Sequence, residues 1–163
     1  IENVSRQLLE IPQDTTHIFI SAGGNNAILN ADVLQLNVHN SAEVFDILAN
    51  RASDFEYYYK EMLKKVLTLN LPTAVCTIYF PNSPDEFIQK ISVAALTIFN
   101  DIIIRQAFLN GLPLIDLRLV CNEKSDYANE IEPSSKGGGK IADTILKVVN
   151  EFDFSRKQTH IFF

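Results

Sequence analysis

Two short stretches of the sequence carry side chains that suit acyl-transfer chemistry. The first is SAGGNNAILN, Ser21–Asn30, in which two glycines and two asparagines follow an apolar run. Glycines at a strand's end let the backbone turn sharply and approach a ligand, and an asparagine amide there can donate to a developing oxyanion. The same Gly-Gly-Asn-Asn composition is typical of an ordinary turn, so these residues alone leave both interpretations open.

The second stretch is NEIEPSSKGGGKIAD, Asn129–Asp143, in which Glu132 stands directly before a helical pattern that begins at Pro133. A carboxylate in this place is a candidate general base. A glutamate, with an ordinary pKa of about 4.3, is a poorer base near neutral pH than a histidine at about 6.5, unless burial raises its value. Because Glu132 lies between an isoleucine and a proline, we expect it to be partly buried.

Together and in this order, the two stretches resemble blocks of the SGNH, or GDSL-like, hydrolases. GGNN is similar to the family's Gly-x-Asn-Asp block. EPSSKGGGKIA is similar to its final block, in which Asp-x-x-His precedes Pro-Ser, a Gly and a helical Ile-Ala. The resemblance runs from about residue 3 to residue 149.

The resemblance implies a role for each matching residue. Asn25 would donate to the oxyanion, and Gly23 and Gly24 would shape the turn around it. Glu132 would stand in the position of the catalytic His, with Asn129 behind it in the position of the Asp. A further asparagine, Asn26, replaces an Asp that mostly holds the loop.

The family's nucleophile is the Ser of a Gly-Asp-Ser block upstream of these stretches, and the 163 residues contain no Gly-Asp-Ser. Ser21 precedes the GGNN turn and its neighbours do not match the block, so we reject it as the nucleophile. The resemblance therefore implies that the chain starts inside the family's domain and carries half of an active site. It predicts an ester hydrolase for a carboxylic ester or small acyl substrate, without a cofactor. The alternative is a non-catalytic relative that serves as a binding or assembly module.

Other clusters are weaker candidates. GGGK, Gly137–Lys140, lacks the first Gly, the following Ser or Thr and the preceding strand of a phosphate loop. Asp126 and Glu130 lie close in sequence without a third type of ligand nearby, and the three histidines are scattered. We therefore predict neither a phosphate loop nor a metal site.

The elements that position these residues alternate between apolar strands and amphipathic helices. Near-continuous apolar runs predict parallel strands covered on both faces, near residues 17–21, 73–79 and 113–118. Helical periodicity predicts helices near residues 4–9, 41–69, 84–110 and 135–152. This alternation predicts right-handed crossovers and a three-layer, doubly wound α/β fold with a mainly parallel sheet, and the resemblance makes it flavodoxin-like. Ligands of such sheets bind beyond the carboxyl ends of the strands.

We expect one domain over residues 1–153, followed by a tail over residues 154–163. The tail ends in THIFF, Thr159–Phe163, which nearly repeats THIFI at Thr16–Ile20. We expect it to form an extra strand, either beside the GGNN strand, where the family's missing strand would lie, or in a homodimer. A frayed terminus is the alternative.

Charge and composition narrow the range of possible binding partners. The chain has 14 basic and 20 acidic residues, a net charge of −6, and 47% hydrophobic residues. The acidic balance disfavours nucleic acid and anionic membrane surfaces as partners. No signal peptide is recognised, and no apolar run approaches the length of a membrane span. Cys76 and Cys121 are expected to be buried free thiols, which together with these features predicts a cytoplasmic protein.

Overall fold

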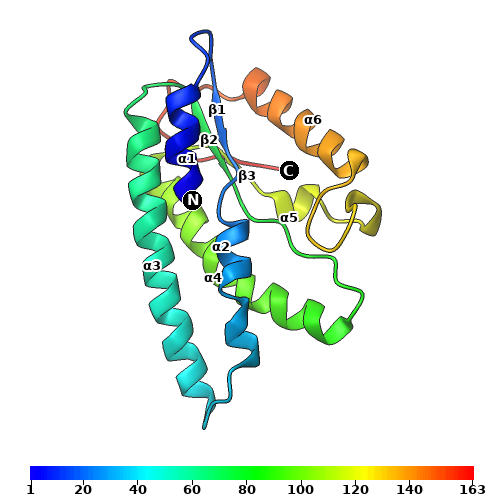
Figure 1. Ribbon diagram of the computed structural model, residues 1–163. Coiled ribbons are helices and arrows are strands. Elements are labelled where there is room, and N and C mark those ends of the chain that lie inside the picture. The colour runs from blue at the N-terminus through cyan, green and yellow to red at the C-terminus, as the bar shows by residue number, and fades with distance from the viewer.

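Four parallel strands form the centre of the computed structural model, which describes residues 1–163 (Figure 1). In spatial order they are β1 (Ile18–Ile20), β2 (Thr73–Cys76), β3 (Leu114–Ile115) and β4 (Ile161–Phe162). Each strand pairs in parallel with the next, and all are short. The predicted α/β class and parallel sheet are confirmed, and the three predicted strands lie inside their predicted ranges.

Six α-helices surround the sheet. They are α1 (Glu2–Gln7), α2 (Gly24–Leu29), α3 (Ser41–Leu67), α4 (Glu86–Asn110), α5 (Leu117–Val120) and α6 (Ser135–Glu151). Short 3-10 helices cover Leu8–Glu10, Ala31–Gln35 and Lys124–Asp126. The boundaries of the long helices follow from capping: the side chains of Asn40, Asp85 and Ser134 accept bonds from first-turn N–H groups.

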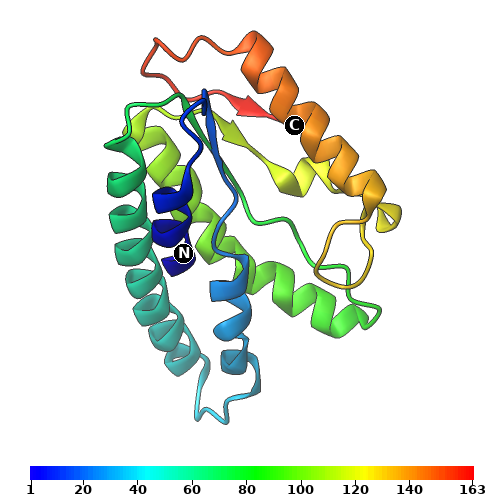
Figure 2. The same cartoon turned by 45° about the horizontal axis from the view of Figure 1, so that its top comes forward.

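Helices cover both faces of the sheet, as expected for three layers (Figure 2). Val75 of β2 points toward α3 and α4, where it packs in a core that includes Tyr59 and Ile103. Its neighbours Ala74 and Cys76 point the other way, into a second core that includes Val148 of α6. This alternation is the period of two that a strand buried on both faces requires.

The tail forms β4 against β3, at the edge of the sheet opposite to β1, and not beside β1 as we expected. Phe162 is buried there against the α6 core. All three connections move in the same direction across the sheet, yet α3 and α4 lie on one face and α6 on the other. The β3–β4 connection therefore has the opposite hand to the first two, which departs from the uniform right-handed crossovers that we predicted.

Helix α4 is long and apolar enough to cross a membrane, by length and composition alone. The expectation that no apolar run approaches this length therefore does not hold for α4. In the fold its C-terminal half packs Phe99, Ile102 and Ile103 into the α3-side core. A long core helix passes the same compositional test.

The start of α6 is fixed by a close contact with the preceding loop. A Cβ atom on Gly137 would collide with the backbone oxygen of Asp126, whereas one on Gly139 would meet nothing within 4 Å. Glycine is therefore required at the first position and is a helix-weakening residue at the second.

We predict that Gly137→Ala lowers the free energy of unfolding by about 2–3 kcal/mol, because the methyl group forces the loop away from α6. Gly139→Ala, the matched control, should raise it by about 0.5–1 kcal/mol. Urea unfolding followed by circular dichroism measures both. Equal effects of the two substitutions would show that this contact does not constrain the fold.

Candidate functional site

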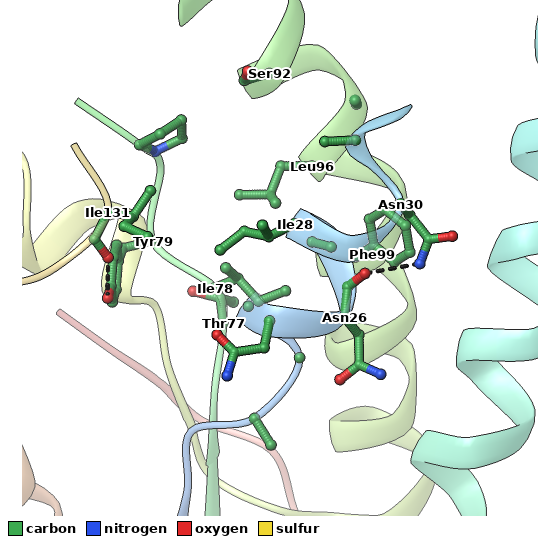
Figure 3. Close-up of a pocket in the computed structure, with 18 of the residues that line it drawn as sticks. Asn26, Ile28, Asn30, Thr77, Ile78, Tyr79, Ser92, Leu96, Phe99 and Ile131 are labelled. Carbon is green, nitrogen blue, oxygen red and sulfur yellow. Dashed lines mark hydrogen bonds between the residues drawn. The ribbon is translucent and has the colours of Figure 1, made fainter. Parts of the chain in front are cut away.

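A cavity of about 550 Å³ lies beyond the carboxyl ends of β1 and β2 (Figure 3). Its walls come from α2, the N-terminal half of α4, the segment after β2 and the loop before α6. Five of the six predicted site residues line it, namely Gly23, Gly24, Asn25, Asn26 and Glu132. The sixth, Asn129, lies directly behind Glu132. The two stretches that the sequence singled out therefore meet in one cavity.

The GGNN stretch begins helix α2 and is not a simple turn. Gly23 has φ of 123°, a conformation that favours glycine, and a Cβ there would approach the ring of Phe55 to 2.9 Å. Asn25 follows in the first turn with its side chain exposed. Asn26 is tied on two sides: its backbone oxygen accepts from the Asn30 side chain at 2.8 Å, and its Oδ1 accepts from the Ile1 amino group at 2.9 Å.

Asn129 orders the loop that carries Glu132. Its Oδ1 accepts from the backbone N–H groups of Ile131 and Glu132, both at 2.9 Å. Its Nδ2 donates to Glu132 Oε2 at 3.3 Å, so an amide takes the place behind the carboxylate. Glu132 itself is exposed, and the partial burial that we expected is wrong. The residues on either side of it do not enclose the carboxylate, which is an exposed member of the cavity lining.

Two tyrosines that the sequence did not single out anchor this loop to the rest of the site. The Tyr79 hydroxyl donates to the Ile131 carbonyl at 2.8 Å, a bond visible in Figure 3. The Tyr127 hydroxyl lies 2.8 Å from the Phe80 carbonyl oxygen, and burial raises the pKa of Tyr127 to about 12. Burial also raises the pKa of Tyr79, helped by the charges of Cys121 and Glu132. Tyr79 ends the apolar run TAVCTIYF, where a tyrosine looks like a core residue, and Tyr127 stands in a polar loop that has no periodicity.

The same loop is fastened to α6 through a buried carboxylate. Asp126 is fully buried and accepts from the Glu123 N–H at 2.9 Å and from Lys140 Nζ at 2.8 Å. Its other oxygen has no hydrogen-bond partner and lies 4.0 Å from Lys136 Nζ. Burial by itself would raise the pKa of Asp126. The hydrogen bonds from Lys140 and from the Glu123 N–H, together with the charges of Lys140 and Lys136, have the larger effect, so the pKa of Asp126 is lower than its ordinary value.

A buried asparagine holds the segment after β2. Asn100 of α4 is fully buried; its Oδ1 accepts from the Ile78 N–H at 2.7 Å and its Nδ2 donates to the Ile78 carbonyl at 2.9 Å. The Asn100 amide thus pairs with the backbone of Ile78 as a neighbouring strand would, and Ile78 lines the cavity. The signal that could have found it is a polar residue among the apolar positions of α4.

The cavity contains a donor and a carboxylate but no activated nucleophile. Ser21 is at the rim, and its hydroxyl makes no hydrogen bond to a base. No protein-family model matches the chain, and no similar protein is found among curated proteins or solved structures. The class that the structure defines is therefore an α/β protein with a parallel sheet and a cavity at the carboxyl ends of its strands.

We predict that Asp126→Asn lowers the free energy of unfolding at pH 7 by about 2–4 kcal/mol, because it removes the charge of a fully buried carboxylate that pairs with the partly exposed Lys140. The folded-state pKa of Asp126 is below its unfolded value, so this stability is present above the unfolded value of about 3.9 and is lost as the pH falls through the folded value.

The difference between wild type and variant should therefore shrink as urea unfolding is repeated from pH 7 to pH 3. Asp143→Asn, an exposed acid on α6, is the control and should change little at either pH. A difference that is the same at both values would mean that the Asp126 charge does not stabilise the loop.

Proposed function

We propose that the cavity binds a small acyl compound, such as a carboxylic ester, in the manner of a GDSL-like hydrolase site. The observation that carries the proposal is the meeting of Asn25 and Glu132 in one cavity, although 107 positions separate them in the sequence (132 − 25). Their chemistry and their places after β1 and before α6 fit the resemblance of both stretches to that family. The flavodoxin-like arrangement of the family is part of this proposal.

In this proposal Asn25 holds the oxygen of the acyl group. An exposed amide at the cavity wall can donate to a carbonyl oxygen, and the bond strengthens as negative charge develops there. Glu132, oriented by Asn129, accepts the proton of an attacking hydroxyl. Three serines line the cavity, Ser21, Ser83 and Ser92, and none donates a hydrogen bond to a carboxylate or a histidine, so the proposal names none of them as the attacking hydroxyl.

A second candidate is a binding module without catalysis. The exposure of Glu132 favours it, and the group that stands behind Glu132 is the amide of Asn129 and not a second carboxylate. Both candidates require the same ligand site and differ only in turnover.

The binding step is tested by a substitution that fills the cavity. Ala95 lines it, whereas its neighbour Ala94 is exposed and does not. Ala95→Phe should weaken the binding of ethyl butyrate by about tenfold or more, since the ring occupies the space of the ligand, and Ala94→Phe should leave binding unchanged. Saturation-transfer NMR titrations measure both. Equal affinity in the two variants would contradict the proposed site.

The chemical step is tested with an activated ester. Residues 1–163 should not hydrolyse p-nitrophenyl butyrate above the buffer rate, because an oxyanion donor stabilises nothing until a nucleophile attacks. Ser21→Ala should behave identically. Hydrolysis by the wild-type chain that disappears in Ser21→Ala would place the nucleophile at Ser21 and overturn this part of the proposal.

A further inference from the structure

The charged side chains around the cavity have one sign. Its wall is mostly apolar: Ile28, Ile78, Leu96 and Phe99 meet in the middle of the site (Figure 3). The only charged side chains that line it are Glu130 and Glu132, and no lysine, arginine or histidine side chain does. The amino group of Ile1 is also at the wall, where it donates to Asn26.

Neither of these two glutamates is neutralised. Glu130 and Glu132 form no ion pair, although other acids close to the site do: Asp32 pairs with Arg51 and Asp116 with Arg118. These two arginines are thus already engaged. The two carboxylates leave a negative rim above an apolar wall.

The rim is also held in place. The backbone oxygen of Glu130 accepts from the Asn82 N–H at 2.8 Å, and that of Glu132 accepts from the Ala128 N–H at 2.9 Å. Between them, the Ile131 carbonyl accepts from the Tyr79 hydroxyl at 2.8 Å, and the Ile131 side chain lines the cavity. Two carboxylates on a fixed backbone can meet a bound charge without a large loss of loop entropy.

We propose that the cavity selects ligands with an apolar body and a cationic group, with the body against the α2 and α4 wall and the cation at Glu130 and Glu132. Charge complementarity decides the class, since an anion would meet two unpaired carboxylates and no basic side chain. The one positive group at the wall, the amino group of Ile1, already donates to Asn26. A volume of about 550 Å³ suits a small molecule. Tyr79 also lines the cavity, beside the Ile131 that lies between the two glutamates in the loop, where an aromatic ring can contact an ammonium group. The inference rests on the proposed function only for the location of the ligand.

The test compares three probes with the same six-carbon chain: hexyltrimethylammonium, 1-hexanol and hexane-1-sulfonate. Isothermal titration at low salt should rank them in that order, with the cation about tenfold tighter than the sulfonate, because partly exposed charge pairs contribute a few-fold each. The cation's advantage should fall as salt is added. Ala95→Phe should abolish binding of the cation, which locates it in the cavity.

The double variant Glu130→Gln, Glu132→Gln should bring the cation and the sulfonate to within about threefold of each other. Glu151→Gln removes an exposed acid at the far end of α6 and should leave the ratio unchanged. Two results would overturn the inference: sulfonate binding as tightly as the cation, or cation binding that persists in Ala95→Phe. If ethyl butyrate still binds in the cavity, the proposed function stands in either case. If neither the probes nor ethyl butyrate bind, both fall.

Discussion

Parallel pairing of β1, β2 and β3 is the constraint on which the cavity depends. Parallel strands end at the same edge of the sheet, so the GGNN helix, the segment after β2 and the loops after β3 must all begin there. The strands are short, and the pairing alone would not hold the segments that extend beyond them. Side chains hold these segments instead, since Asn100 pairs with the backbone of Ile78 and the Tyr79 hydroxyl with the carbonyl of Ile131.

The loop that carries Glu132 shows how polar contacts substitute for regular structure. The buried carboxylate of Asp126 fastens it to Lys140 of α6, the Tyr79 hydroxyl holds the carbonyl of Ile131, and the Asn129 side chain holds the N–H groups of Ile131 and Glu132. Gly137 lets α6 approach this loop closely enough for the pair to form. Because the backbone is fixed at these points, the carboxylates at the mouth stay exposed without moving freely, and an exposed acid is better suited to charge recognition than to proton abstraction at neutral pH.

Much of the fold could be predicted from the sequence, because a strand buried on both faces leaves a near-continuous apolar run and a long amphipathic helix leaves a clear period. The ranges of β1, α3 and α6 follow closely from these two patterns. The site was predictable only as far as its residue types: GGNN and Glu132 were recognisable, while the exposure of Glu132 was not, since it depends on the path of the loop. Asn100 was missed because a single polar residue on a helix has no period. The place of β4 was missed because the sequence of a two-residue strand does not indicate which strand it pairs with.

The claim that the loops after β1 and before α6 form one ligand site is tested most directly by mapping a bound ester on the backbone. In ¹⁵N-labelled protein, ethyl butyrate should shift the amide signals of residues 23–26 and 130–132 together, with a single saturation curve. Shifts confined to one of the two segments, or gathered instead along the outer edge of β1, would contradict it.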